Sequence, residues 1–179
     1  MEQDSGSQRG ILKGLSRKRI FLIVTFLVIV LGLGIGVGLM KGSDNPAFCA
    51  SCHVMKPYYD SWKNSSLLAK KHADHNVKCH DCHEASFSTL FNDGVRYVTG
   101  NYKTPLEKRQ FPRDFCLKCH DDFNSIKAKT AFAESNPHDS HNGEQDCNVC
   151  HSVHQQSKLM CAQCHVFQWE NKLDASWVQ

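Results

Sequence analysis

The sequence has little excess charge of one sign, few strand-forming patterns, and few aliphatic residues outside one block. Its 179 residues carry a formal charge of only +3. Nucleic-acid binding normally shows a strong basic patch, so no nucleic-acid partner is expected. The aliphatic side chains gather in residues 20–40, and the rest of the chain is polar and loop-rich. A soluble part of this size needs a buried core. We therefore expect something other than side chains to fill much of it.

No cysteine lies outside one repeated motif. All ten cysteines fall in five CxxCH sequences, and the chain has 11 histidines. CxxCH is the signature of c-type haem attachment, in which the two thiols form thioethers with the porphyrin and the adjacent histidine supplies the proximal iron ligand. The sequence therefore predicts five covalently bound haem c groups. The attachment residues are Cys49, Cys52, Cys79, Cys82, Cys116, Cys119, Cys147, Cys150, Cys161 and Cys164, and the proximal ligands are His53, His83, His120, His151 and His165.

Other uses of paired cysteines fit less well. Structural zinc binds four thiolates, or two thiolates and two imidazoles, and gives no reason for a histidine after every pair. A disulfide scaffold would space its cysteines irregularly. A thioredoxin-like motif would occur once, beside a βαβ pattern. Metal is therefore expected only as haem iron.

Residues 20–40 form an uncharged run that is long enough to span a bilayer as a helix. A cleaved signal peptide would have a shorter apolar region followed by an A-x-A-like site, which this segment lacks. The positive-inside rule keeps residues 1–19 in the cytoplasm and exports residues 45–179, because the positive charges precede the run. We expect a single-pass protein of the cytoplasmic (inner) membrane, in contact with lipid, with its haem domain on the periplasmic side. The preceding charges are Arg9, Lys13, Arg17, Lys18 and Arg19.

Four glycines lie in the outer half of this segment with GxxxG spacing, at Gly32, Gly34, Gly36 and Gly38. Such a stripe favours close contact between helices. It could serve a homodimer, a complex with a partner's helix, or flexibility near the membrane surface, and these alternatives stay open.

The five motifs repeat without the fixed period of a solenoid. We expect short helices at residues 55–71, 87–101 and 125–134, joined by irregular loops. The predicted fold class is mainly α and irregular, with a single N-terminal transmembrane helix and a haem-packed multihaem cytochrome c domain. Neighbouring haems would lie close enough for electrons to pass rapidly from one haem to the next.

Six histidines remain after the proximal ligands are assigned. His80 lies inside its own CxxC loop and is interpreted as a surface residue. Low-potential haems usually have two histidine ligands, whereas a methionine ligand raises the potential. The candidate distal ligands are His72, His75, His138, His141 and His154.

Residues 45–62 contain the pattern F-C-x-S-C-H-x-M-x-P followed by a tryptophan. This stretch resembles the first haem site of the membrane-anchored NapC/NirT/NrfH quinol dehydrogenases, and Cys79-His-Asp-Cys82-His83 is similar to their second site. The resemblance implies a high-spin first haem at the membrane surface that oxidises menaquinol or ubiquinol. It also implies that Met55 replaces His53 as iron ligand and frees His53 to accept a proton from quinol. The alternative for Met55 is packing against the porphyrin.

Two features depart from that family's pattern. The family typically carries four haems, whereas this chain has five attachment motifs. Nitrite-reductase partners in the family have an aspartate near the first haem and lysines near the quinol, and the corresponding segment here differs. The candidates for the quinol site are Lys56, Asp93 and Arg96.

Residues 136–165 resemble the small tetrahaem cytochromes and the haem domain of flavocytochrome c fumarate reductases. That resemblance implies that His138 and His154 are distal ligands and that haems 4 and 5 form the exit end. It also implies a multihaem or flavin-containing reductase as partner. The tail after residue 165, with Trp169 and Trp177, is expected to cap haem 5 or to join a docking surface.

Together these patterns predict a pentahaem cytochrome of anaerobic respiration that oxidises quinol and passes electrons to an extracytoplasmic terminal reductase. One alternative is a multihaem reductase of a small substrate such as nitrite or hydroxylamine. Another is an anchored relay without quinol activity. Whether the chain is itself an enzyme or an electron-transfer subunit with quinol dehydrogenase activity is left open.

Overall fold

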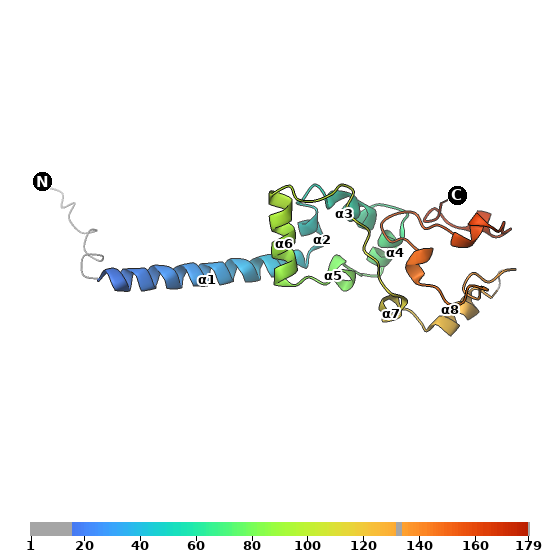
Figure 1. Cartoon of the computed structure of the whole chain (residues 1–179), viewed down its shortest axis with the longest axis horizontal. Helices are drawn as coiled ribbons and strands as arrows, with labels where there is room; N and C mark the ends of the chain where they lie inside the picture. The colour runs from blue at the N-terminus through green and yellow to red at the C-terminus, as the bar shows by residue number, and fades with distance from the viewer. Residues whose placement is uncertain (1–15, 132–133, 179) are drawn as a thin grey trace, which may run out of the picture. The chain divides into compact units, whose positions relative to one another are not determined.

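A computed structural model describes residues 16–131 and 134–178, and the chain divides into two compact units, Met1–Ser43 and Asp44–Gln179. The described elements are helical (Figure 1), and no strand forms within these ranges. The expected fold class, mainly α and irregular, is therefore confirmed.

The first unit contains α1 (Arg17–Ser43), a helix of 27 residues that extends the expected helix at both ends. Its apolar side chains are exposed around the whole circumference. Among the described helices, α1 is the one that is long and apolar enough to cross a membrane. A Cβ atom added at Gly32, Gly34 or Gly38 would meet nothing within 4 Å. The chain's own packing therefore does not explain these glycines, and a contact with a second helix remains a prediction.

Short helices and turns make up the described part of the second unit. They are α2 (Pro46–Cys49), α3 (Lys56–Lys63), α4 (Leu68–Asp74), α5 (Cys79–Cys82), α6 (Phe87–Val98), α7 (Arg113–Cys116) and α8 (Phe123–Lys129), followed by the 3₁₀ turns η1 (Cys147–Val149), η2 (Met160–Gln163) and η3 (Glu170–Lys172).

The single helix expected over residues 55–71 is wrong, because α3 and α4 are separate helices. Ser65 Oγ donates to Ser61 O at 2.5 Å and accepts from Leu67 N at 3.0 Å. Serine and asparagine side chains compete with the backbone in this way, which favours breaks in helices. Trp62 Nε1 donates to Val77 O at 2.9 Å and ties α3 to the segment that follows α4.

The other two expected helices form with different ends. Helix α8 begins earlier than expected because Asp122 Oδ1 accepts from Asn124 N at 3.0 Å and from Ser125 N at 3.2 Å, which makes Asp122 an N-cap. Helix α6 ends earlier, two residues before Gly100. Gly100 has φ +70°, a backbone conformation that glycine adopts without strain and that turns the chain.

Side chains alone do not build a core in the second unit. Among its described residues, the buried apolar residues are Ala69 and Pro46, and the other buried side chains include Ser61, Ser157 and Ser176. A soluble unit of this size normally buries a large apolar core. The burial pattern therefore agrees with the expectation that the core is not made of side chains.

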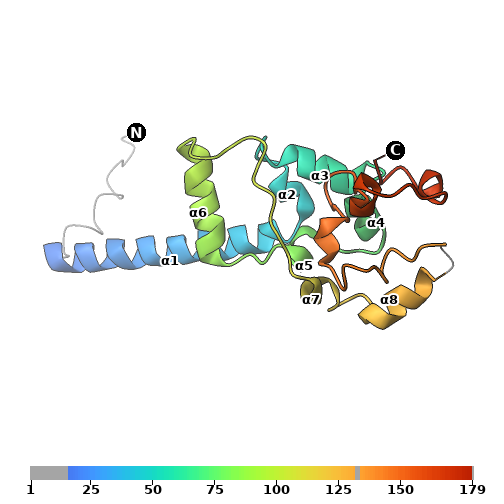
Figure 2. The ribbon, with the colours of Figure 1, turned by 45° about the vertical axis from the view of Figure 1, so that its right-hand side comes forward.

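The C-terminal tail lies beside α4 (Figure 2), and Ser66 Oγ, just before α4, donates to Ala175 O at 3.3 Å. Ser157 N donates to Ser176 O at 2.8 Å, and Val178 N donates to Ser157 O at 2.9 Å. These bonds form an isolated parallel bridge between Ser157 and Trp177. Ala69 N donates to Val153 O at 2.9 Å. Residues 152–158 are therefore hydrogen-bonded both to α4 and to the C-terminal tail.

An ion pair from Lys71 to Asp174, at 2.5 Å, makes this fastening sensitive to acid. Lys71 and then Ser176 lower the pKa of Asp174 to about 2. A carboxylate with a lowered pKa stabilises the folded state above its ordinary pKa near 4, and this stability is lost as the pH falls toward 2. Both side chains are about half exposed, so the contribution is at most about 1 kcal/mol.

We expect pepsin to release the C-terminal tail of the wild-type protein faster at pH 2 than at pH 4, because Asp174 is neutralised between these values. The variant Asp174→Asn should be cleaved equally fast, relative to its own core, at both pH values. Asp139→Asn, which removes a different exposed ion pair with Lys127, should behave as wild type. Mass spectrometry of the released peptide measures this, and equal pH dependence in wild type and Asp174→Asn would contradict it.

Candidate functional site

The CxxCH motifs fold into similar tight turns. In four of them the histidine N–H donates to the carbonyl of the first cysteine: His83 to Cys79 at 2.8 Å, His120 to Cys116 at 3.1 Å, His151 to Cys147 at 2.8 Å and His165 to Cys161 at 2.9 Å. In the first motif Cys52 N donates to Cys49 O at 3.3 Å. The two thiols and the histidine of each motif therefore lie within about one helical turn of one another.

Four of these histidines face a second histidine. Two imidazoles on opposite sides of one metal, each bonded at about 2 Å, have ring centres about 6 Å apart. The observed separations of the ring centres agree with this value. They are 6.3 Å for His83 and His154, 6.0 Å for His120 and His72, 6.2 Å for His151 and His138, and 5.9 Å for His165 and His141.

Three of the second histidines are held through Nδ1. His72 Nδ1 lies 2.8 Å from Leu68 O and His154 Nδ1 lies 2.8 Å from Ser61 Oγ. The Ser61 hydroxyl donates to Tyr58 O at 2.6 Å, so it accepts from the Nδ1–H of His154. His138 Nδ1 lies 3.0 Å from Thr130 Oγ1. A hydrogen bond at Nδ1 fixes the tautomer and leaves Nε2 as the nitrogen for a metal.

Burial keeps several of these rings neutral. It lowers the pKa of His151 to about 4, with help from the neighbouring His138, and it lowers the pKa of His154 to about 4, with help from His83. Burial also lowers the pKa of His83 and of His138. Neutral imidazole is the form that binds metals. The residues present therefore fit four haem irons with two histidine ligands each.

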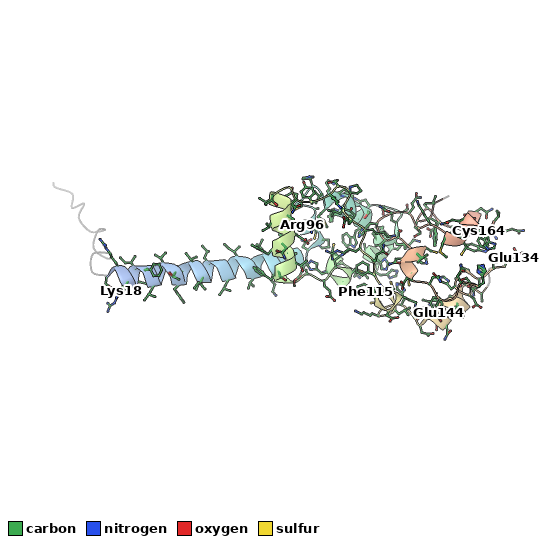
Figure 3. The ribbon with its side chains drawn as sticks, in the orientation of Figure 1. Lys18, Arg96, Phe115, Glu134, Glu144 and Cys164 are labelled. Atoms are coloured by element: carbon green, nitrogen blue, oxygen red, sulfur yellow. The ribbon has the colours of Figure 1, made fainter. Side chains whose placement is uncertain are left out.

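Thiols of successive motifs are neighbours in space. A hydrogen bond with Cys79 lowers the pKa of Cys49 to about 6, and the same bond raises the pKa of Cys79. Cys116 is hydrogen-bonded to Cys147, and electrostatic interactions link Cys82 with Cys119 and Cys150 with Cys161. The spatial order of the motifs thus follows their order in the chain. Figure 3 shows Arg96 on α6 at one end of the second unit and Cys164, in the fifth motif, at the other.

His53 has different neighbours. Its Nδ1 lies 2.9 Å from the Tyr97 hydroxyl and its Nε2 lies 3.3 Å from the Tyr102 hydroxyl. The two tyrosine rings stack with their centres 5.8 Å apart. Within the described residues, no ring contact joins His53 to another histidine. The first motif therefore differs from the other four in its surroundings.

Tyr97 and Tyr102 were not among the residues singled out from the sequence. They flank the turn at Gly100, which brings Tyr102 back beside Tyr97. Both tyrosines lie more than 40 residues from His53 in the sequence, so no local pattern predicts that they contact it. Two tyrosines on either side of a glycine turn were the only available indication.

The candidate quinol-site residues lie in several different environments. Lys56 Nζ is paired with Asp60 at 2.7 Å, and Arg96 Nε donates to Asn101 O at 3.2 Å. Asp93 is exposed on α6. Met55 is the N-cap residue immediately before α3, two positions after His53.

The two remaining histidines are not paired with a proximal histidine. His75 is exposed and is the C-cap residue immediately after α4. His80 Nδ1 lies 3.5 Å from Asp44 Oδ1, and the His80 side chain is 24% exposed. Of the five histidines considered as distal ligands, the structure thus brings four to a CxxCH histidine and leaves His75 apart.

The aromatic tail touches two sites rather than one. Trp177 packs against His151 of the fourth motif, with ring centres 5.0 Å apart. Trp169 stacks on Phe167 at 5.0 Å, and Phe167 lies 5.8 Å from His165 of the fifth motif. Trp169 Nε1 is buried and has no hydrogen-bond partner among the described residues, and Trp169 lines a cavity of about 210 Å³ beside His165. Such an N–H fits an acceptor on a bound group, as a haem propionate would supply.

Comparison with known proteins agrees with this geometry. The chain matches the cytochrome c3 family over residues 71–166. It is 33% identical over 184 residues to the cytochrome c-type protein Cgr1 of Eggerthella lenta, which covers 83% of this chain and 84% of that protein. The chain belongs to the family of multihaem c-type cytochromes.

Two further relatives extend the comparison. The cytochrome is 26% identical over 124 residues to the cytochrome c-type protein NrfH of Wolinella succinogenes, covering 61% of this chain and 67% of that protein. It is 35% identical over 69 residues to the acrylate reductase cytochrome subunit of Shewanella woodyi, covering 35% of this chain and 58% of that protein. No solved structure matches the chain. The expected resemblance to the membrane-anchored NapC/NirT/NrfH cytochromes is therefore confirmed, and the cytochrome carries covalently bound haem c for electron transfer.

Proposed function

We propose that this cytochrome binds five haems, oxidises menaquinol or ubiquinol at the first haem site, and passes the electrons to an extracytoplasmic reductase. The observation that carries the proposal is the contrast between the first motif and the other four. His83, His120, His151 and His165 each face a second histidine, whereas His53 faces Tyr97 and Tyr102. The surroundings of a haem decide between electron transfer and reaction with a substrate, so the site with different surroundings is the candidate for the quinol reaction.

The proposed ligand set follows from the paired rings. His154, His72, His138 and His141 are the distal ligands of haems 2, 3, 4 and 5. Either Met55 or His53 is the protein ligand at the first site. Bis-histidine ligation favours low potential. Each bound haem supplies one-electron redox chemistry, and the protein sets the distances between the haems, their potentials and the access of quinol.

The quinol reaction sets requirements on the first site. Oxidation of one quinol to quinone releases two electrons and two protons, and the electrons leave singly along the order of the motifs. Quinol dissolves in lipid, so this site must lie near the bilayer. The first motif meets that requirement through the covalent chain, because Cys49 follows the end of α1 at Ser43 by six positions. We propose that α1 spans the cytoplasmic membrane once, with the second unit on the periplasmic side.

The fifth motif is the proposed exit. It lies at the opposite end of the second unit from α6, which carries Tyr97 (Figure 3). The acrylate reductase cytochrome subunit, by its name, serves a reductase. We propose a multihaem or flavin-containing reductase as partner, docked near haems 4 and 5.

Anaerobic reduction of the detergent-solubilised protein by menaquinol and ubiquinol analogues tests the function. We expect quinol to reduce the haems, as followed at the α band, and one high-spin haem among four low-spin haems in the EPR spectrum. If all haems are low-spin and quinol reduces none, an anchored relay is the better account. Turnover of nitrite or hydroxylamine without a partner would instead favour a reductase.

Tyr97 offers a specific test of the first site. The variant Tyr97→Phe keeps the ring stack on Tyr102 and removes the hydrogen bond to His53 Nδ1. Partners of this kind are worth about 10–100-fold in activity at other metal sites, so quinol-dependent reduction should slow by about that factor. Reduction by dithionite should be unchanged. Tyr59→Phe is the control, because Tyr59 packs on Trp62. Equal quinol rates for both variants and wild type would contradict a role for Tyr97.

A further inference from the structure

Helix α6 presents an unpartnered apolar stripe. Successive residues are about 100° apart around a helix, so the members of this stripe fall within about 80° of one another. They are Phe87, Phe91, Val95 and Val98, and their exposed fractions are 59%, 62%, 45% and 84%. The rings of Phe87 and Phe91 stack with their centres 6.3 Å apart. Contiguous apolar stripes that are exposed in this way mark contact with a membrane or with another protein.

The other two sides of α6 differ in character. Thr89, Asn92 and Arg96 lie on the side away from the stripe and are polar. On the third side, the Tyr97 hydroxyl lies 2.9 Å from His53 Nδ1. Ser86 caps the start of the helix by accepting from Thr89 N at 3.1 Å. The apolar stripe is therefore on a fixed helix that is tied to the first CxxCH motif.

The covalent chain limits how far this helix can lie from the bilayer. The second unit begins at Asp44, directly after α1, and His53 follows nine positions later. Nine residues span at most about 32 Å when fully extended, and the helical turn of α2 shortens that reach. If α1 crosses the membrane, His53 and the Tyr97 bound to it lie close to the membrane surface. Lipid is therefore the partner that is always available to cover the apolar stripe of α6.

We propose that α6 lies in the plane of the membrane interface, with Phe87, Phe91, Val95 and Val98 inserted at the boundary between headgroups and acyl chains. Amphipathic helices with one apolar face bind membranes in this orientation. The inference rests on the proposed membrane orientation but not on quinol oxidation. In this arrangement α6 attaches the first CxxCH motif to the bilayer in addition to α1. This second attachment keeps His53 at the membrane surface, where a lipid-soluble substrate is available.

Photo-crosslinking in lipid nanodiscs tests the contact on the full chain with its haems attached. We expect the variant Phe91→p-benzoylphenylalanine to give at least about fivefold more lipid adduct than Asn92→p-benzoylphenylalanine, because only position 91 faces the acyl chains. Position 92 is the matched control, since it is the next residue and lies outside the apolar stripe. Equal labelling at both positions, no lipid adduct at either, or adducts at position 91 to a second protein in place of lipid would each overturn the proposal.

A second pair of variants separates this inference from the proposed function. Phe91→Asp should slow reduction by quinol supplied in the bilayer severalfold and leave reduction by dithionite unchanged, whereas Asn92→Asp should change neither. If wild type is not reduced by quinol but position 91 forms lipid adducts, quinol oxidation fails and the interfacial helix stands. If quinol reduces wild type and Phe91→Asp at the same rate, and no adduct forms, the interfacial helix fails and quinol oxidation stands.

Discussion

Replacing His72 with alanine should convert one low-spin haem to high-spin, whereas replacing His75 should leave every haem unchanged. Both histidines lie at the end of α4, three positions apart, and both were candidate distal ligands in the sequence. Only His72 faces a CxxCH histidine, with its ring centre 6.0 Å from that of His120, and its Nδ1 is held by Leu68 O. Removing it would therefore leave the iron that His120 is proposed to ligate with one axial protein ligand instead of two.

EPR and absorption spectra of the oxidised variants measure the change. A further variant, His72→Met, should remain low-spin but raise the potential of that haem by on the order of 0.1 V, since axial ligands shift haem potentials over a range of about 0.8 V. His75→Met should leave all potentials unchanged. A second high-spin signal, beyond that of the first haem, in His75→Ala, or no such second signal in His72→Ala, would show that the proposed pairing of α4 with the third motif is wrong.

The number of possible haem sites could be predicted from the sequence, because thioether attachment requires a local motif. The pairing of the distal histidines could not. His154 and His83 come from distant parts of the second unit, and they meet because Ser61 on α3 holds His154 while α4 bonds to Val153. These contacts depend on tertiary structure. By contrast, the reason that His75 faces no CxxCH histidine is local, because it lies three positions beyond His72, where α4 ends.

The surroundings of His53 show a similar limit. Asp93 and Arg96 were selected by position relative to the resembling family, yet the α6 residue that reaches His53 is Tyr97. Helix periodicity separates these side chains, since Tyr97 lies about 100° around the helix from Arg96. The break between α3 and α4 was not predicted; it lies at Ser65 and Ser66, whose hydroxyl groups bond to the backbone.

Opposite losses of function are expected when haem attachment is prevented at the two ends of the cytochrome. The double variant of Cys161→Ala and Cys164→Ala removes the thiols of the fifth motif, and that of Cys49→Ala and Cys52→Ala removes those of the first. Because the thiols of neighbouring motifs interact electrostatically in chain order, the first variant should still be reduced by quinol but should no longer pass electrons to its reductase. The second variant should lose reduction by quinol and still be oxidised by the reductase after reduction with dithionite.

Anaerobic titration with dithionite provides the control for both double variants, since each should take up four electrons per chain and the wild type five, one for each attached haem. A variant that takes up fewer than four has lost more than the intended haem, and a single-site change (Cys164→Ala or Cys52→Ala) then replaces it. The two ends have separate roles only if the losses are opposite. If removal of the fifth motif abolishes quinol reduction as well, electrons do not enter at the first motif, because the four upstream haems would still be present to accept them.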